Sequence, residues 1–273
     1  MSLQQLIYAS AVPVSAARHG TLSVDHTDHA HCRHLNSVPL MVAEFAAAAA
    51  EYPIVFAQGA DSVLPVAVLG ARQRQNLFVD AQGRWQAQYL PAFVRRYPFV
   101  FAEDASQRLT LCVDETCPGL NREGRGQALF IADGQPSAHV NEVLAFLQAY
   151  RAQFAITKAF CARLQALDLL TAMQAQFSLG TGERAALTGF LAVDRDRLKA
   201  LPADTLAELI QADALELVYG HLQSLRNFEL LKTRLATTAA PVADTDAPLA
   251  ALPAGAAAEV DSAAEVDSAA TVA

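Results

Sequence analysis

Two neighbouring apolar runs, YPIVFA at residues 52–57 and LPVAVLG at residues 64–70, indicate where the sheet of this protein begins. Each run is short, rich in β-branched residues and bounded by Gly, Pro or Asp, which is typical of a strand. Short strands at such spacing favour an antiparallel sheet over a series of βαβ units. We therefore predict a β-rich stretch over residues 52–133, with further strands at residues 76–80, 85–93, 99–102, 109–114 and 128–133.

Downstream, the apolar residues recur at helical spacing. From Val140 to Leu164 they follow one another at steps of three, four and seven, which is one face of an amphipathic helix. Ser137 is a suitable N-cap for it. The pattern predicts a helix from residue 137 to about residue 167.

A second hairpin and a second helical stretch are expected after that helix. Residues 172–179 and 187–194 are predicted to pair across Gly180-Thr-Gly182, and helical spacing returns between Pro202 and about Leu235. The predicted class is α+β, a mainly antiparallel central sheet with two long helices and a second hairpin.

The last part of the chain has a different composition. Residues 239–273 contain no aromatic and no basic residue, and the sequence AAEVDS occurs twice, at residues 257–262 and 263–268. Such a segment buries too little surface to offset the entropy of ordering it, so we predict a disordered acidic tail. Binding to a partner is the other interpretation of this tail. We expect one α+β domain over residues 1–236, β-rich at about 52–133 and mixed helical at about 137–236.

Composition excludes several classes of function. The net charge of −8 argues against a nucleic-acid-binding protein, which normally carries a basic patch. There is no run of 18 apolar residues and no basic-then-apolar start at the N-terminus. We therefore expect a cytoplasmic protein without a transmembrane segment, whose four cysteines are free thiols.

One stretch is rich in possible metal ligands: DHTDHAHCRH at residues 25–34. His26 and Asp28 match the first half of a facial triad of two histidines and one carboxylate, which His139 or His221 would complete. His26, Asp28 and His221 are our candidate metal ligands, and such a triad would suit a non-haem iron oxygenase. The alternative is adventitious metal binding by a flexible loop. No motif in the sequence identifies a cofactor, and we expect that the protein has none.

Arg95 and Arg96 are the second candidate group. On the predicted strand they would point to opposite faces, so one of them would face the core and need a partner. One hypothesis is a guanidinium clamp on a carboxylate or phosphate. The other is a structural ion pair with Asp80, Glu103 or Asp114.

A polar and aromatic concavity is a third hypothesis. It would gather Arg72, Asn76, Trp85 and Tyr89 beside the two arginines, as pockets for small ligands or peptides do. An ordinary sheet core would explain the two aromatic residues equally well. Nucleophile elbows and phosphate-binding glycine loops are absent from the sequence.

Short motifs recur from residue 34 to residue 221. They are HLNSVPL (34–40), EF (44–45), EYPIVF (51–56), LG (69–70), QNLFVD (75–80), GxW (83–85), YLPAFVRRYPF (89–99), GF (189–190) and ALELVYxH (214–221). In this set the chain resembles the SapC family over about residues 1–236. The block from Asn76 to Phe99 is the most specific part of the resemblance, because its order and spacing are hard to obtain by chance. The resemblance implies an association with transport or presentation of a bacterial surface-layer protein, and it implies no catalytic residue.

Three functional hypotheses follow. The first, which we prefer, is a non-catalytic accessory protein that binds a protein or peptide client destined for the cell surface. The second is an enzyme that modifies a peptide or small molecule, with iron held by the histidine stretch. The third is a metal-free ligand-binding domain in which Arg95 or Arg96 holds an anion.

Overall fold

The computed structural model describes residues 6–59, 62–104, 106–178, 184–237 and 246–248. The predicted class, α+β, is confirmed. Of the predicted disordered tail, residues 239–273, all but residues 246–248 lies outside the described residues. The strands are β1 (Ala11–Pro13), β2 (Ser23–Val24), β3 (Ser37–Pro39), β4 (Ile54–Gln58), β5 (Val63–Val68), β6 (Phe99–Glu103), β7 (Leu109–Asp114), β8 (Leu120–Asn121), β9 (Gln127–Ala128), β10 (Leu170–Ser178), β11 (Arg184–Val193) and β12 (Asp246–Pro248).

The central sheet has the strand order β10-β11-β4-β5-β3, and every neighbouring pair in that order is antiparallel. The strands expected at residues 52–57 and 64–70 are its β4 and β5, which are almost wholly buried. The second hairpin is β10 and β11, and it joins this same sheet because β11 pairs with β4. Its turn, residues 179–183, lies outside the described residues.

The helices are α1 (Ala16–His19), α2 (Phe45–Ala48), α3 (Ala92–Arg95), α4 (Ala138–Ala166), α5 (Arg195–Lys199), α6 (Ala203–Gln211), α7 (Ala214–Ser224) and α8 (Phe228–Thr237), with short 3-10 turns at Ala30–Cys32, Val42–Glu44 and Leu225–Asn227. The predicted first long helix is α4, and the Ser137 side chain accepts a hydrogen bond from the Val140 N–H at its start. The second helical stretch is divided into α6, α7 and α8. Asp213 has φ of 53°, which ends the run of α6 before α7 begins.

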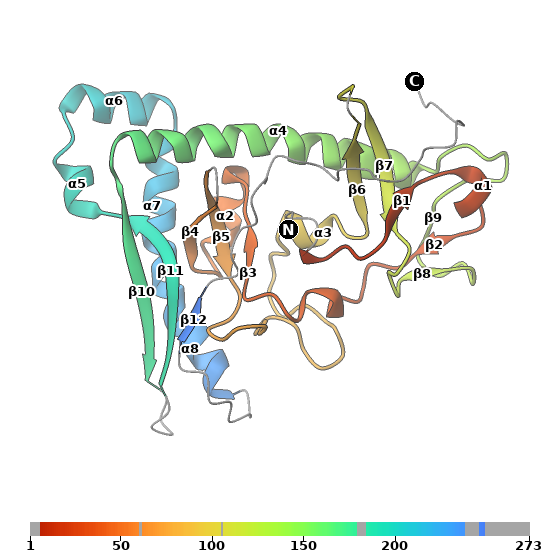
Figure 1. The fold of residues 1–273 in the computed structure, drawn as a ribbon, viewed down its shortest axis with the longest axis horizontal. Helices are drawn as coiled ribbons and strands as arrows, with labels where there is room; N and C mark the ends of the chain where they lie inside the picture. Colours follow the sequence, from red (N-terminus) through yellow and green to blue (C-terminus); the bar gives the residue numbers. More distant parts are fainter. Residues whose placement is uncertain (1–5, 60–61, 105, 179–183, 238–245, 249–273) are drawn as a thin grey trace.

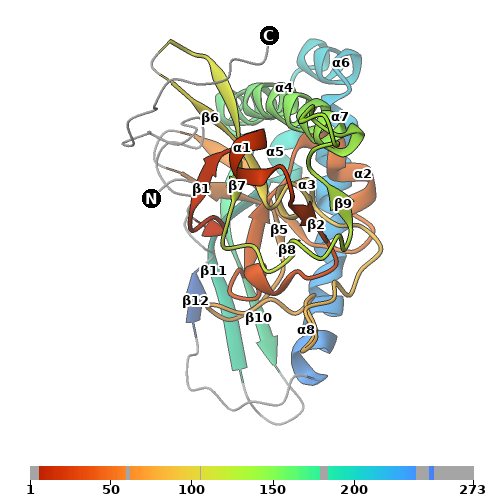
Figure 2. The same ribbon diagram turned by 90° about the vertical axis from the view of Figure 1, so that its right-hand side faces the viewer.

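Helix α4 runs along most of the molecule and joins its two parts (Figure 1). At one end lie the β10–β11 hairpin and α5 to α8. At the other end lie two small sheets, β1-β7-β6 and β8-β2-β9. Figure 2 looks along the molecule from this second end, where β1, β2 and α1 lie in front. Each end has its own cluster of buried apolar side chains: a large one around the central sheet and a smaller one that includes Val24, Phe99, Val113 and Leu147.

The strands predicted at residues 76–80 and 85–93 are wrong, although the turn between them forms. A single bridge joins Val79 to Trp85, and residues 92–95 are the helix α3. Side chains take the place of a neighbouring strand here: the Phe78 N–H donates to the Asn76 side chain, and the Tyr89 N–H donates to a Glu51 carboxylate oxygen. Because side chains satisfy these backbone groups, no ladder is needed. The strand expected at residues 128–133 is likewise reduced to β9 and one bridge.

Within the described parts of the chain, no helix combines the length and the apolar character needed to cross a membrane.

Candidate functional site

A cavity of about 310 Å³ lies between three segments that are far apart in the sequence. The first is the histidine-rich loop that follows β2, the second is α3 with the residues leading into β6, and the third is the start of α4. Part of the lining is apolar and includes Leu90, Phe99 and Phe146. The lining also contains imidazole, guanidinium and carboxylate groups, from His26, Asp25, Asp28, His29, His31, Arg95, Arg96, His139 and Glu142.

Two histidines that come from different segments of the cavity lining contact each other. The Nε2 atoms of His26 and His139 are 3.3 Å apart, and both rings pack near Phe99. Burial is the first cause that lowers the pKa of each ring, and the neighbouring His139 lowers that of His26 further. Both rings are therefore neutral at physiological pH, and one donates its N–H to the lone pair of the other.

Two more histidines of the loop line the same cavity. The His31 ring stacks on Tyr97 with 4.0 Å between centroids, and burial lowers the pKa of His31 to about 4. Burial also lowers the pKa of His29. Asp28 serves the loop itself, since its carboxylate accepts the Ala30 N–H at 2.7 Å. The loop thus presents neutral imidazoles to the cavity.

The two arginines differ as expected, but for a different reason. They belong to the end of α3 and not to a strand, and Arg96 is 9% exposed whereas Arg95 is exposed at the surface. The Arg96 guanidinium packs over the rings of Phe93, Tyr150 and Tyr8, at 4.5, 5.1 and 5.6 Å from their centroids. Aromatic faces attract a cation in this way without an ion pair. Among the described residues, its Nε and Nη2 atoms have no hydrogen-bond partner.

The acidic partners expected for a buried arginine are engaged elsewhere. Asp80 pairs with Arg84, and Glu103 pairs with Arg151. Asp114 is fully buried and accepts backbone N–H groups from Ala9, Ser10 and Thr116. The prediction of an ion pair between Arg96 and one of these three carboxylates is therefore wrong.

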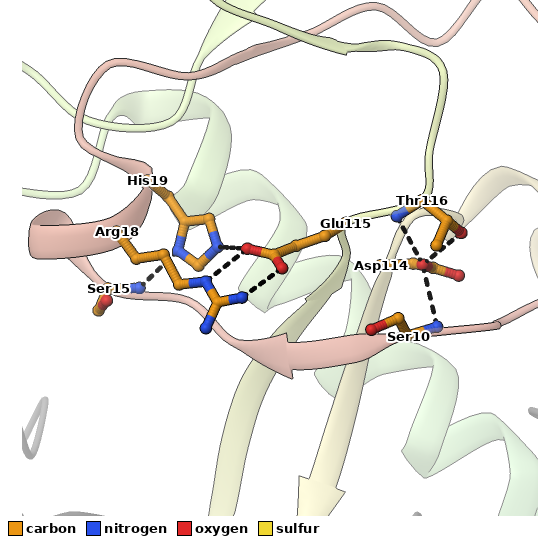
Figure 3. A network of polar contacts seen from close by, with 7 residues as sticks. All are labelled: Ser10, Ser15, Arg18, His19, Asp114, Glu115 and Thr116. Atoms are coloured by element: carbon orange, nitrogen blue, oxygen red, sulfur yellow. Dashed lines mark hydrogen bonds and ion pairs between the residues drawn. The ribbon is translucent and has the colours of Figure 1, made fainter.

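Figure 3 shows how this part of the chain is held in place. The Glu115 carboxylate, next to Asp114, binds the Arg18 guanidinium at 2.6 Å and the His19 ring at 3.2 Å. Together the two carboxylates fasten the N-terminal segment, including β1 and α1, to the turn after β7. Cys117 follows in that turn and lines the cavity, and burial raises the pKa of its thiol.

The predicted concavity is not assembled as one site. Arg95 and Arg96 line the cavity, whereas Arg72, Asn76, Trp85 and Tyr89 are not among its lining residues in the described chain. The last three support the scaffold: the Asn76 amide donates to the Cys32 carbonyl at 3.1 Å, the Trp85 indole donates to the Tyr89 carbonyl at 3.1 Å, and the Tyr89 hydroxyl donates to Glu44 at 2.8 Å. Arg72 is buried.

The predicted metal set is also divided. His26 and Asp28 line the cavity, but His221 lies fully buried on α7, between β4 and β11. Its Nδ1–H donates to the Ile54 carbonyl at 2.8 Å, and its Nε2 accepts the Val193 N–H at 3.0 Å. Both ring nitrogens are thus used within the fold, and His139 stands beside His26 instead. Among the residues that the structure describes, no group of three or more His, Cys, Asp or Glu side chains is placed to hold a metal ion.

Of the α4 residues that line the cavity, the reasoning from sequence named only His139, as an alternative to His221 in the metal triad, and it assigned Glu142, Val143 and Phe146 to no site. His139, Glu142, Val143 and Phe146 lie at positions i, i+3, i+4 and i+7 and all line the cavity. This spacing places them on one face of the helix. This spacing could have revealed a second face of the helix in the sequence, because these four positions lie on a different face from the buried Val140 and Leu147.

Comparison with known proteins gives a family. A search of curated proteins and a search of solved structures found no match. The family model SapC matches residues 14–231, which include every segment that forms the cavity. That match covers well over half of the chain, and the chain belongs to the SapC family.

Proposed function

We propose that this protein is a non-catalytic accessory protein that binds a peptide segment of a client destined for the cell surface. The observation that carries the proposal is the cavity, whose lining combines apolar side chains with guanidinium and imidazole groups. Sites of this composition bind small ligands or short peptide segments, with a few polar groups that fix their orientation. Membership of the SapC family is consistent with the proposal, because the resemblance to that family implies an association with surface-layer proteins.

Arg95 is the side chain that we assign to the client. It is exposed, its guanidinium lies 4.9 Å from the centroid of the Phe146 ring, and it lines the cavity. Two of the neighbouring carboxylates, Asp25 and Asp28, accept backbone N–H groups of their own loop. A carboxylate of the client, from an acidic side chain or a C-terminus, would therefore bind Arg95. An apolar side chain next to that carboxylate in the client would pack against Phe146.

Peptide display with the full chain tests this proposal. The best peptide is then measured by calorimetry against the wild type, Arg95→Ala and the control Arg195→Ala, which removes an exposed arginine of α5. We expect Arg95→Ala to weaken binding at least about tenfold, in line with the loss of one charge-assisted hydrogen bond, and Arg195→Ala to leave it unchanged. Equal affinities of the two variants would contradict the assignment of the cavity.

The histidine pair favours a second candidate, a metal-dependent enzyme. Two nitrogens bound to one tetrahedral metal at ordinary distances lie about 3.3 Å apart. His26 and His139 have this separation, and their rings would turn from their mutual hydrogen bond so that both lone pairs point at the ion. They would supply two ligands, with Glu142 one helical turn beyond His139. Calorimetric titration with Zn²⁺ and Fe²⁺ tests this candidate: stoichiometric binding that is lost in His139→Ala supports it, and binding unchanged by that substitution contradicts it.

A further inference from the structure

The β10–β11 hairpin contains an irregularity that changes the course of β11. Phe190 pairs with Met173 and Leu187 pairs with Ala175, so β11 has one more residue than β10 between these two pairs. Gly189 lies at this point with φ of 79°, a conformation that favours glycine. This is a β-bulge, and a bulge bends its strand and increases its twist.

The bend leaves one side of β11 without the strand that would continue the central sheet. β4 pairs only with Phe190 and Leu191, on the far side of Gly189. Residues 184–188 of β11 therefore extend past the point where β4 stops (Figure 1). The main-chain N–H and C=O groups on this side of the arm are open to another strand.

That side is occupied by a segment of the chain itself. β12 pairs with β11 in parallel, with Asp246 opposite Ala186, Ala247 opposite Leu187 and Pro248 opposite Thr188. β12 lies beside β11 in both views (Figure 1 and Figure 2). It belongs to the segment that composition alone predicts to be disordered.

We propose that the edge of β11 at residues 186–188 is a docking site for an extended peptide segment of the client, and that β12 is an internal occupant of that site. The identity of the partner rests on the proposed function. Recognition is by main-chain hydrogen bonds, as when a peptide adds a strand to an exposed sheet edge. The tail then regulates binding by competition.

The rest of the hairpin is suited to hold an added strand. Leu187 and Ala185 are buried, and Phe177 and Phe190 pack on Phe228 of α8, so one face of the arm is fixed to a helix. Between these residues Ala186 and Thr188 are partly exposed. The edge is therefore rigid, and the small side chains along it leave room for an incoming strand.

The internal occupant is suited to exchange. It pairs over three residues only and in parallel, an arrangement slightly less stable per residue than antiparallel pairing. In the sequence, β12 is separated from the end of α8 at Thr237 by residues 238–245, and an occupant joined covalently to its site through so few residues has an effective concentration in the millimolar range. A longer client segment gains more main-chain hydrogen bonds and displaces it.

Replacement of the tail strand in the full chain tests the proposal. In the test variant residues 244–250 become Gly and Ser with the length unchanged, and in the matched control residues 261–267 are replaced in the same way. Hydrogen exchange measures the β11 amides, and fluorescence anisotropy measures a labelled peptide of residues 241–253. We expect those amides of residues 186–188 whose N–H groups face β12 to exchange at least tenfold faster in the test variant than in the wild type, and we expect the test variant to bind the peptide at least tenfold more tightly. The control is expected to match the wild type in both measurements.

Two results would overturn the proposal: equal exchange in all three proteins, or peptide affinity that does not rise when the internal strand is removed. Arg95→Ala keeps this test separate from the proposed function. It is expected to leave the labelled peptide bound as before, because Arg95 lies on α3 and not on the hairpin. If the labelled peptide of residues 241–253 does not bind at β11 while the displayed peptide still binds at the cavity, the docking site is refuted and the proposed function is not.

Discussion

His221 and the pair His26–His139 are buried to different degrees and serve different ends. The His221 ring is fully buried, and both of its nitrogens bond to backbone groups of β4 and β11. The rings of His26, on a loop, and His139, at the start of α4, contact each other in the lining of a cavity. An imidazole whose nitrogens are both bonded to the main chain stabilises the fold, whereas one that faces a cavity has a lone pair or an N–H to offer to a ligand.

The largest expected effect is at His221. His221→Ala removes two buried hydrogen bonds, leaves the Ile54 carbonyl and the Val193 N–H without these partners, and opens a cavity beside Phe56, whose ring lies 4.9 Å from the imidazole. Losses of this kind reduce the free energy of unfolding by about 3 kcal/mol. Urea unfolding followed by circular dichroism measures it. A loss below about 0.5 kcal/mol, the size typical of a surface substitution, would contradict the structural role of His221.

The same ring predicts a dependence of stability on pH. Burial lowers the pKa of His221 from 6.5 to about 4, so between these values the unfolded state binds the proton and the folded state does not. Stability therefore falls as the pH falls from about 6.5 to about 4, by a few kcal/mol at 1.36 kcal/mol per unit. His31, with a pKa also near 4, adds to the loss in the same window.

His221→Gln separates this contribution from the others. Glutamine offers a donor and an acceptor but does not titrate. We expect the variant to be less stable than the wild type at pH 7.5 and to lose less stability between pH 6.5 and pH 4. A wild-type slope retained in His221→Gln would show that other groups cause the pH dependence.

The two arginines of α3 come next in magnitude. Arg96→Ala removes a guanidinium and its stem from between the rings of Phe93, Tyr150 and Tyr8, and we expect a loss of about 2 kcal/mol in the free energy of unfolding. Arg95→Ala is expected to change stability little, as surface substitutions do. Thermal unfolding of both variants gives the comparison. Equal, small effects would contradict the packing of Arg96.

Much of the fold could be predicted from the sequence, because its periodic parts carry their own signal. β4, β5 and α4 were found from strand punctuation and from helical spacing. The stretch from Asn76 to Phe93 looked like strands for the same reason, yet its N–H groups bond to Asn76, Glu51 and Glu44. Glu51 and Glu44 are far from this stretch in the sequence, and partners of that kind leave no local periodicity. Propensity alone therefore assigns the stretch wrongly as strands.

The site was harder to predict than the fold. The histidine-rich loop could be recognised by composition, but nothing local in the sequence decides between His139 and His221 as the neighbour of His26. Residues 113 positions apart meet there because α4 begins beside the loop. Arg96 shows the same limit: that one arginine would be buried followed from adjacency, whereas its aromatic surroundings come from three separate segments.

The smallest expected effect concerns the histidine pair, and it distinguishes contact from mere proximity. His139→Ala leaves the ring of His26 without the neighbour that disfavours its protonation, so the pKa of His26 rises toward its ordinary value while burial still holds it below. His29→Ala is the matched control, because His29 is the last of the causes that act on His26. NMR titration of the His26 ring protons in the full chain measures both shifts. Equal shifts in the two variants would show that the 3.3 Å contact between Nε2 atoms is not kept in solution. The cavity would then present its imidazoles singly, and only the peptide-binding proposal would still have a site of the required composition.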